Sequence, residues 1–276
     1  MNESPLFRDL PQSLLSNIVE QLREFSVGFT RAVPAYRDRR VELIGSGTLV
    51  KAGDRYAILT AHHVLEDFPR GPRLGLLLDS ANQMTSIDQH GLRFLDIARG
   101  RDDSEGPDIG AVILAEPVAS ALRAQKRFFD LGFHRESMLN SPLPDEHGLW
   151  VANGFVDELT RRGPEGGIFH VTFRNQSLMG IVERCPMIGE FDYFNVPVDV
   201  EERATVPGDF GGMSGGGLWQ LQIAQSKDGT LSSRQPKLSG LVFYQLPTTD
   251  TQCGLRCHGR RSVYETAYAA ILGMGD

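Results

Sequence analysis

Three short segments carry side chains that could act together in nucleophilic catalysis. His62 and His63 follow an apolar run, Asp108 opens another apolar run, and Ser214 lies inside a glycine-rich segment. A serine hydroxyl is a weak nucleophile at neutral pH and needs an adjacent base such as histidine. A carboxylate that holds the imidazole in one tautomer completes such a set. We therefore predict acyl-transfer chemistry with His63 as base, Asp108 as orienting acid and Ser214 as nucleophile.

The elements that must position these residues are mostly short strands. Apolar runs separated by Gly, Pro, Asp and Asn begin near residue 41 and are typical of all-β proteins. Strands are predicted at 41–50, 55–60, 74–78, 92–97, 109–114, 149–155, 169–173, 180–183, 193–198, 217–221 and 238–245. Helices are predicted at 12–26, 118–125 and 264–272, and surface loops at 101–107, 136–148, 160–167 and 225–237.

The three segments resemble the motifs of the trypsin/chymotrypsin family of serine proteases. Residues 60–63 (TAHH) resemble its T-A-x-H motif, residues 108–110 (DIG) its D-[IL]-A motif, and residues 212–216 (GMSGG) its G-x-S-G-G motif. The order His, Asp, Ser along the chain is that of chymotrypsin and differs from that of subtilisins. The resemblance spans residues 40–250 and depends on all three motifs together, since the aspartate motif alone is weak.

The resemblance implies a fold, a domain organisation and an oxyanion hole. The fold would be mostly β, a chymotrypsin-like double six-stranded β-barrel with an N-terminal amphipathic helix and a short C-terminal helix. Residues 1–38 would be a helical extension, and residues 39–276 the peptidase domain, with the boundary between barrels near 135–150. The oxyanion hole would use the backbone N–H groups of Gly212 and Ser214.

The substrate pocket predicted by the resemblance is formed by two segments. Gly208 lies about six residues before the nucleophile, with Asp209 beside it, and the later strand contributes Phe243, Tyr244 and Gln245. Asp209 would favour Arg or Lys before the scissile bond, at the position called P1, if its side chain faces the pocket. Gln245 stands where chymotrypsin-like enzymes have a small residue, and its side chain would narrow the pocket.

Met213 departs from the pattern of the secreted enzymes. Those enzymes have aspartate before the nucleophile, and it pairs with a newly cut N-terminus during zymogen activation. Methionine predicts instead that activity is set by the conformation of residues 208–214 or by a partner protein. The amphipathic helix at 12–26 either packs on the domain behind it or docks such a partner.

Each candidate also has a purely structural interpretation. His62 competes with His63, although adjacent strand residues point to opposite faces, so only one of them would reach the site. Asp108 would then only cap a turn, and Ser214 would be a polar loop residue. Cys253, Cys257 and His258 have a loose zinc-ligand spacing, which we interpret as a turn with partly buried thiols and exposed arginines rather than a metal site.

Composition limits the other function classes. A net charge of −7 argues against a sequence-independent nucleic-acid binder, which needs a basic face. Three cysteines are too few for the disulfide framework of a secreted protease. The first residues lack the apolar region of a signal peptide, and no apolar run is long enough for a membrane span, which predicts a cytoplasmic location.

The functional prediction is a serine endopeptidase that cleaves a protein or peptide substrate without a cofactor or metal. A protease in the cytoplasm must be restrained, which suits a bacterial stress-response or anti-phage defence pathway with a regulatory partner at the N-terminal helix. One alternative is a catalytically silent trypsin-fold module that binds proteins. A third is an esterase or another acyl transferase using the same serine.

Overall fold

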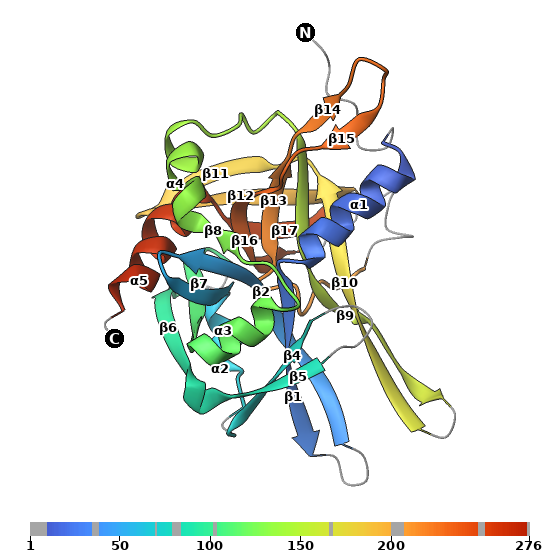
Figure 1. Cartoon of the computed structure of the whole chain (residues 1–276), viewed down its shortest axis with the longest axis vertical. Helices are drawn as coiled ribbons and strands as arrows, with labels where there is room; N and C mark the ends of the chain where they lie inside the picture. Colours follow the sequence, from blue (N-terminus) through green and yellow to red (C-terminus); the bar gives the residue numbers. More distant parts are fainter. Residues whose placement is uncertain are drawn as a thin grey trace.

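The fold of this chain was analysed in a computed structural model (Figure 1). The structure describes residues 10–34, 39–69, 71–78, 84–101, 104–165, 168–199, 207–247 and 252–274. Two large antiparallel sheets dominate it, which confirms the mostly-β prediction. A two-stranded hairpin of β14 (Ile223–Gln225) and β15 (Leu231–Ser233) projects from the body.

The first sheet has eight strands, in the order β5-β4-β1-β2-β3-β7-β6, with β8 paired to β2. Its strands are β1 (Ser26–Pro34), β2 (Arg39–Ala52), β3 (Arg55–Thr60), β4 (Arg73–Leu77), β5 (Met84–Asp88), β6 (Leu92–Arg99), β7 (Asp108–Leu114) and β8 (Phe129–Asp130). Every residue of β7 is buried, as expected for an apolar strand inside a sheet.

The second sheet has seven strands, in the order β10-β9-β13-β16-β17-β12-β11. Its strands are β9 (Leu149–Glu165), β10 (Ile168–Gly180), β11 (Glu183–Ile188), β12 (Phe191–Asp199), β13 (Gly217–Leu221), β16 (Lys237–Leu246) and β17 (Gln252–His258). In the part of the chain that the structure describes, the end strands of each sheet do not pair with each other, so a closed double six-stranded barrel is not confirmed.

Short helices cover the sheets. They are α1 (Gln12–Arg23), α2 (His62–Glu66), the 3₁₀ turn η2 (Gln89–Gly91), α3 (Glu116–Arg123), α4 (Leu131–Asn140), the π-helical segment η4 (Ser262–Ala267) and α5 (Tyr268–Gly273). No described helix has both the length and the apolar character needed to cross a membrane.

The two sheets share a core of aromatic side chains. Phe25 follows α1, Phe129 lies in β8 of the first sheet, and Trp219 lies in β13 of the second. Their ring centroids are 5.1 Å (Phe25–Trp219) and 5.5 Å (Phe129–Trp219) apart. Aromatic pairs at this spacing contribute about 0.5–1.5 kcal/mol each beyond their burial. This core holds the sheets together behind the site described below.

The N-terminal helix is shorter than predicted and the segment after it is a strand. The predicted apolar face of α1 is present, with Leu14, Ile18 and Leu22 buried against the protein itself. The helix ends at Arg23 rather than at residue 26, because Phe25 turns into the aromatic core. Residues 26–34, expected within a helical extension of residues 1–38, form β1 between β4 and β2.

Four predicted loops or turns contain regular structure, and in one of them, 225–237, residues 231–233 form β15. Residues 131–140 form α4, whose start is capped by Asp130, since its carboxylate accepts the Phe133 N–H at 2.9 Å. Residues 160–165 continue β9, which pairs with β10 in a long hairpin that projects from the body (Figure 1). The segment near Cys253, expected as a turn, is strand β17 between β16 and β12.

Candidate active site

The candidate site lies where the two sheets are joined by Ser46 of β2. The hydroxyl of Ser46 donates to Gly212 O (2.7 Å) and accepts the N–H of Phe155 from β9 (2.7 Å). The backbone N–H of Ser46 donates to Ser214 O (2.8 Å). One buried side chain of the first sheet therefore anchors the serine loop to both sheets.

His63 and Asp108 are brought together by the end of β3 and the start of β7. His63 lies in the first turn of α2, directly after β3. Its Nδ1 is 2.6 Å from Asp108 Oδ2, and its backbone N–H donates to Asp108 Oδ1 at 3.0 Å. Both carboxylate oxygens thus hold the histidine, which fixes the ring orientation and leaves Nε2 for another partner.

Asp108 is buried and carries a third partner that the sequence did not indicate. Arg99 Nη1 is 3.0 Å from Asp108 Oδ2, because Arg99 and Asp108 are paired residues of β6 and β7. Burial alone would raise the pKa of the Asp108 carboxyl, but hydrogen bonds from His63 and the charges of His63 and Arg99 lower it below its usual value. Asp108 is therefore held ionised.

His62, the competing histidine, lies beside carboxylates other than that of Asp108. Its Nε2 is 3.3 Å from Asp96 Oδ1, and its Nδ1 is 3.8 Å from Glu66 Oε1. His62 does not line the pocket that contains His63 and Asp108. The structure thus separates the two neighbouring histidines, and His63 is the one beside Asp108.

The serine loop depends on a glycine that no other residue can replace without strain. Gly215 has φ +90°, and a Cβ there would lie 2.0 Å from Ser46 O. The carbonyl of Gly215 accepts the Thr48 hydroxyl at 3.1 Å, and its N–H donates to Val242 O at 2.8 Å. The loop is therefore fixed between β2 and β16 on either side of Ser214.

The carbonyl of Gly211 fixes the orientation of the peptide group that precedes Gly212. Gly212 has φ +92°, and the carbonyl of Gly211 accepts the Asp157 N–H at 2.8 Å. The N–H and C=O of a trans peptide point in opposite directions, so the Gly212 N–H points away from β9. Within the described residues neither the Gly212 N–H nor the Ser214 N–H has a hydrogen-bond acceptor.

The hydroxyl of Ser214 is beside β16. It donates to Phe243 O at 3.4 Å, and among the described residues no hydrogen bond joins it to His63. Ser214, His63 and Asp108 nevertheless line one pocket of about 310 Å³. The other residues of its lining are Asp209, Phe210, Gly211, Val242, Phe243, Tyr244, Gln245 and Leu255.

Four of the five predicted substrate-binding residues line this pocket, and the fifth borders it. Asp209, Phe243, Tyr244 and Gln245 are in the lining. Gly208 is not in the lining, but its carbonyl accepts the Gln245 side-chain N–H at 3.2 Å. The two segments that the sequence paired as walls of a pocket are therefore neighbours in the structure.

His258 is a residue behind the site that sequence reasoning considered only as a metal ligand. Its Nε2 accepts the Asp108 N–H at 3.0 Å, which holds the start of β7 in place. The ring is buried against Phe243 and Tyr193, at centroid distances of 4.7 and 5.2 Å. Burial lowers the pKa of His258 to about 4, and the Asp108 carboxylate only partly opposes that shift. His258 is therefore neutral at physiological pH.

The buried His258 predicts acid-dependent stability. An unfolded chain protonates this imidazole near its usual pKa of about 6.5, whereas the folded protein does so only near pH 4. The unfolded state therefore binds more protons between these values, and stability is lost as the pH falls through this window. We expect His258 to contribute a loss of about 2 kcal/mol between pH 7.5 and pH 5.

The matched variant is His258→Gln, which keeps a neutral acceptor for the Asp108 N–H. Urea unfolding of both proteins at pH 7.5 and pH 5 should show a smaller loss of unfolding free energy in the variant. The same pH dependence in both proteins would contradict the assignment of this proton to His258.

The cysteine-containing segment is a strand of the second sheet. Cys253 and Cys257 are buried in β17, and Cys253 Sγ lies 3.8 Å from Val198 O. In the described residues no group of three or more His, Cys, Asp or Glu side chains is placed to hold a metal ion. Arg260, expected as exposed, is buried and donates to Gln220 Oε1 at 2.7 Å.

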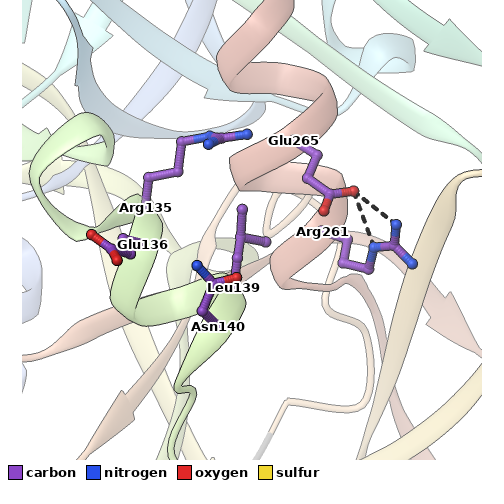
Figure 2. Close-up of a pocket in the computed structure, with 6 residues that line it drawn as sticks. All are labelled: Arg135, Glu136, Leu139, Asn140, Arg261 and Glu265. Atoms are coloured by element: carbon purple, nitrogen blue, oxygen red, sulfur yellow. Dashed lines mark hydrogen bonds and ion pairs between the residues drawn. The ribbon is translucent and has the colours of Figure 1, made fainter.

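A larger surface pocket of about 650 Å³ lies between α4 and η4 (Figure 2). It is lined by Arg135, Glu136, Leu139, Asn140, Arg261 and Glu265. Arg261 pairs with Glu265 at 3.0 Å, and Arg135 donates to Tyr264 O at 3.0 Å. Both arginines of this pocket are therefore already bound to other groups of the protein. The pocket shares no lining residue with the pocket at Ser214.

Comparisons with known proteins do not assign the chain to a family. No family model matches it, and no curated protein matches it. Among solved structures, one from work on aromatic interactions that drive the coupled folding and binding of the intrinsically disordered Sesbania mosaic virus VPg protein is similar at 15% identity. That match covers 88% of this chain and 90% of the other, with a TM-score of 0.43. A likeness this low carries no argument about fold or function.

Proposed function

We propose that this protein is a serine endopeptidase that uses His63, Asp108 and Ser214 as its catalytic triad. The observation that carries the proposal is the double contact of Asp108 with His63, in one pocket with Ser214. The two contacts offset part of the cost of burying this carboxylate, and they fix the orientation of His63 as a catalytic base requires. A glycine-rich loop presents the serine in the same pocket.

In the proposed mechanism His63 Nε2 takes the Ser214 hydroxyl proton as Oγ attacks the substrate carbonyl. The resulting oxyanion accepts the N–H groups of Gly212 and Ser214, and Asp108 stabilises the imidazolium. His63 then gives the proton to the leaving amine, and water hydrolyses the acyl-enzyme by the same route. The Ser214 hydroxyl must first leave Phe243 O, and catalytic hydrogen bonds often form only with substrate bound.

The division of the triad between two sheets supports the chymotrypsin-like arrangement as part of the proposal. Asp108 opens β7 of the first sheet and His63 follows β3 of that sheet, whereas Ser214 lies in the loop that precedes β13 of the second sheet. We propose that the two sheets are the counterparts of the two barrels of that family. A cytoplasmic location and a bacterial stress or defence pathway stay predictions from sequence.

Two observations bear on the predicted regulation by a partner protein or by the conformation of the serine loop. Because the apolar face of α1 is buried against this chain, a partner at this helix would meet its polar face. The Gly211 carbonyl is already turned toward β9 in the isolated chain. We therefore propose that residues 207–216 do not require a partner or a proteolytic cut to form the oxyanion hole.

The alternative is a catalytically silent trypsin-fold module that binds proteins. Two observations favour it: the Ser214 hydroxyl donates to Phe243 O, and Arg99 shares the Asp108 carboxylate with His63. A positive charge beside Asp108 offsets part of its stabilisation of an imidazolium. The endopeptidase requires an activated Ser214 hydroxyl, whereas the binding module does not.

A small alkyl fluorophosphonate separates these functions because it reacts only with an activated serine. We expect one covalent adduct on the native full-length chain without added partner, located on Ser214 by peptide mapping. Heat-denatured protein is the control and should give no adduct. Native protein that remains unmodified at Ser214 would refute the enzyme proposal and leave the binding module.

A further inference from the structure

Gln245 spans the proposed substrate pocket from one wall to the other. It lies near the end of β16, two residues after Phe243, whose carbonyl accepts the Ser214 hydroxyl. The Oε1 atom of Gln245 accepts the Phe210 N–H at 2.8 Å, and its Nε2 donates to Gly208 O at 3.2 Å. One amide thus makes two hydrogen bonds to the backbone of the opposite wall.

The opposite wall is itself held in place, so the bridge has a rigid support. Glu158 of β9 accepts the N–H groups of Gly208 (3.2 Å) and Asp209 (2.5 Å). Phe210 is buried, and its carbonyl accepts the Met213 N–H at 2.9 Å. A long substrate side chain entering between the walls would have to break both amide hydrogen bonds of Gln245, and these polar groups would lose their partners.

Asp209 is not placed to attract a basic substrate side chain at the bottom of the pocket. It is exposed, and its Oδ1 accepts the Gly211 N–H at 2.7 Å within the same loop. Apart from Asp108, whose carboxylate is paired with His63 and Arg99, the buried residues of the pocket lining are apolar, namely Phe210, Val242, Phe243 and Leu255. The interior of the pocket therefore favours an uncharged group.

We propose that Gln245 is the specificity-determining residue of this site and restricts P1 to small, uncharged side chains such as Ala, Ser and Val. This proposal rests on the proposed endopeptidase function, and it replaces the sequence-based expectation of Arg or Lys at P1. The substrate class is thus a protein segment with a small residue before the scissile bond.

The experiment uses a proteome-derived peptide library cleaved by the wild-type chain and by Gln245→Gly, with cleavage sites mapped by mass spectrometry. Matched peptides with Ala, Leu, Tyr or Arg at P1 then give kcat/KM. We expect the wild type to prefer Ala over Tyr and Arg by at least about tenfold. Gln245→Gly should raise kcat/KM for Leu and Tyr about 10- to 100-fold and leave Ala within about threefold.

Two further variants test whether the change in P1 preference comes from the Gln245 side chain itself. Gln225→Gly removes an exposed glutamine from β14 and should leave the P1 ranking unchanged. Gln245→Leu keeps most of the bulk but removes both amide hydrogen bonds, so its rejection of Tyr and Arg should lie between that of the wild type and that of Gln245→Gly. The rate of fluorophosphonate labelling reports whether the serine loop stays intact in each variant.

The outcomes distinguish this proposal from the proposed function. If Ser214 labels with fluorophosphonate but the wild type prefers Arg or Tyr at P1, the inference about Gln245 is wrong and the enzyme proposal stands. The same conclusion follows if Gln245→Gly labels normally and keeps the wild-type ranking. If Ser214 is not labelled in the wild type, the enzyme proposal itself fails.

Discussion

Replacing Ser214 by alanine is expected to lower kcat for peptide hydrolysis by about 10⁶-fold, because the alanine methyl group cannot form an acyl-enzyme. A residual acceleration of about 10³–10⁴ over water would come from the oxyanion hole and substrate binding. The measurement is kcat on the best peptide found in the library. If the variant hydrolyses that peptide as fast as the wild type, Ser214 is not the nucleophile.

This loss is expected without loss of folding. Among the described residues, the Ser214 hydroxyl makes a single hydrogen bond, to Phe243 O at 3.4 Å, and one such bond contributes about 1 kcal/mol or less to stability. The backbone contacts of the loop involve Ser214 O and its neighbouring glycines, which the substitution keeps. Ser226→Ala, at an exposed turn after β14, is the matched control and should keep full activity.

Replacing Asp108 by asparagine is expected to lower kcat by about 10⁴-fold. Asp108 Oδ2 accepts from His63 Nδ1 and faces Arg99, while Oδ1 accepts the His63 N–H. An amide has only one oxygen, and its NH₂ group beside Nδ1 would stabilise the tautomer with the proton on Nε2. His63 would then present a proton to Ser214 instead of accepting one.

The neighbouring histidine supplies the control for Asp108→Asn. His62 pairs with Asp96 at 3.3 Å, and that carboxylate is exposed. Asp96→Asn replaces one exposed partner of His62 by an amide of the same shape, so kcat should stay within about twofold of the wild type. A large loss in Asp96→Asn together with a small loss in Asp108→Asn would assign the catalytic role to His62 instead of His63.

Much of the sheet structure could be predicted from the sequence, since apolar runs bounded by turn residues carry a local signal. The bounds of β3 and β13 match the prediction residue for residue. β1 and β17 were not predicted, because the residues of these two segments carry no clear local pattern that indicates a strand. β1 is stabilised by β2 and β4, and β17 by β12 and β16, which are long-range partners.

Some helical and hairpin segments were also not predicted, because their local sequence lacks a clear hydrophobic pattern. The Asp130 cap and α4 were missed because the apolar residues of α4 do not gather on one face. Residues 160–165 of β9 were expected as a loop, since their polar sequence lacks an apolar face. Pairing with β10 holds this segment in an extended conformation, with Glu165 opposite Ile168.

The sequence by itself determined which residues are candidates for the chemistry, because each family motif lies within a few neighbouring positions and its order along the chain can be read directly. Only the tertiary structure decided that His63 and not His62 faces Asp108, that Arg99 and His258 hold that aspartate, and that Gln245 bridges the pocket. His258 reaches Asp108 across 150 positions and Gln245 reaches Phe210 across 35. The contact of His258 depends on how the two sheets pack against each other, and that of Gln245 on the pairing of β16 with β13 within one sheet. No local pattern of residue types encodes either arrangement.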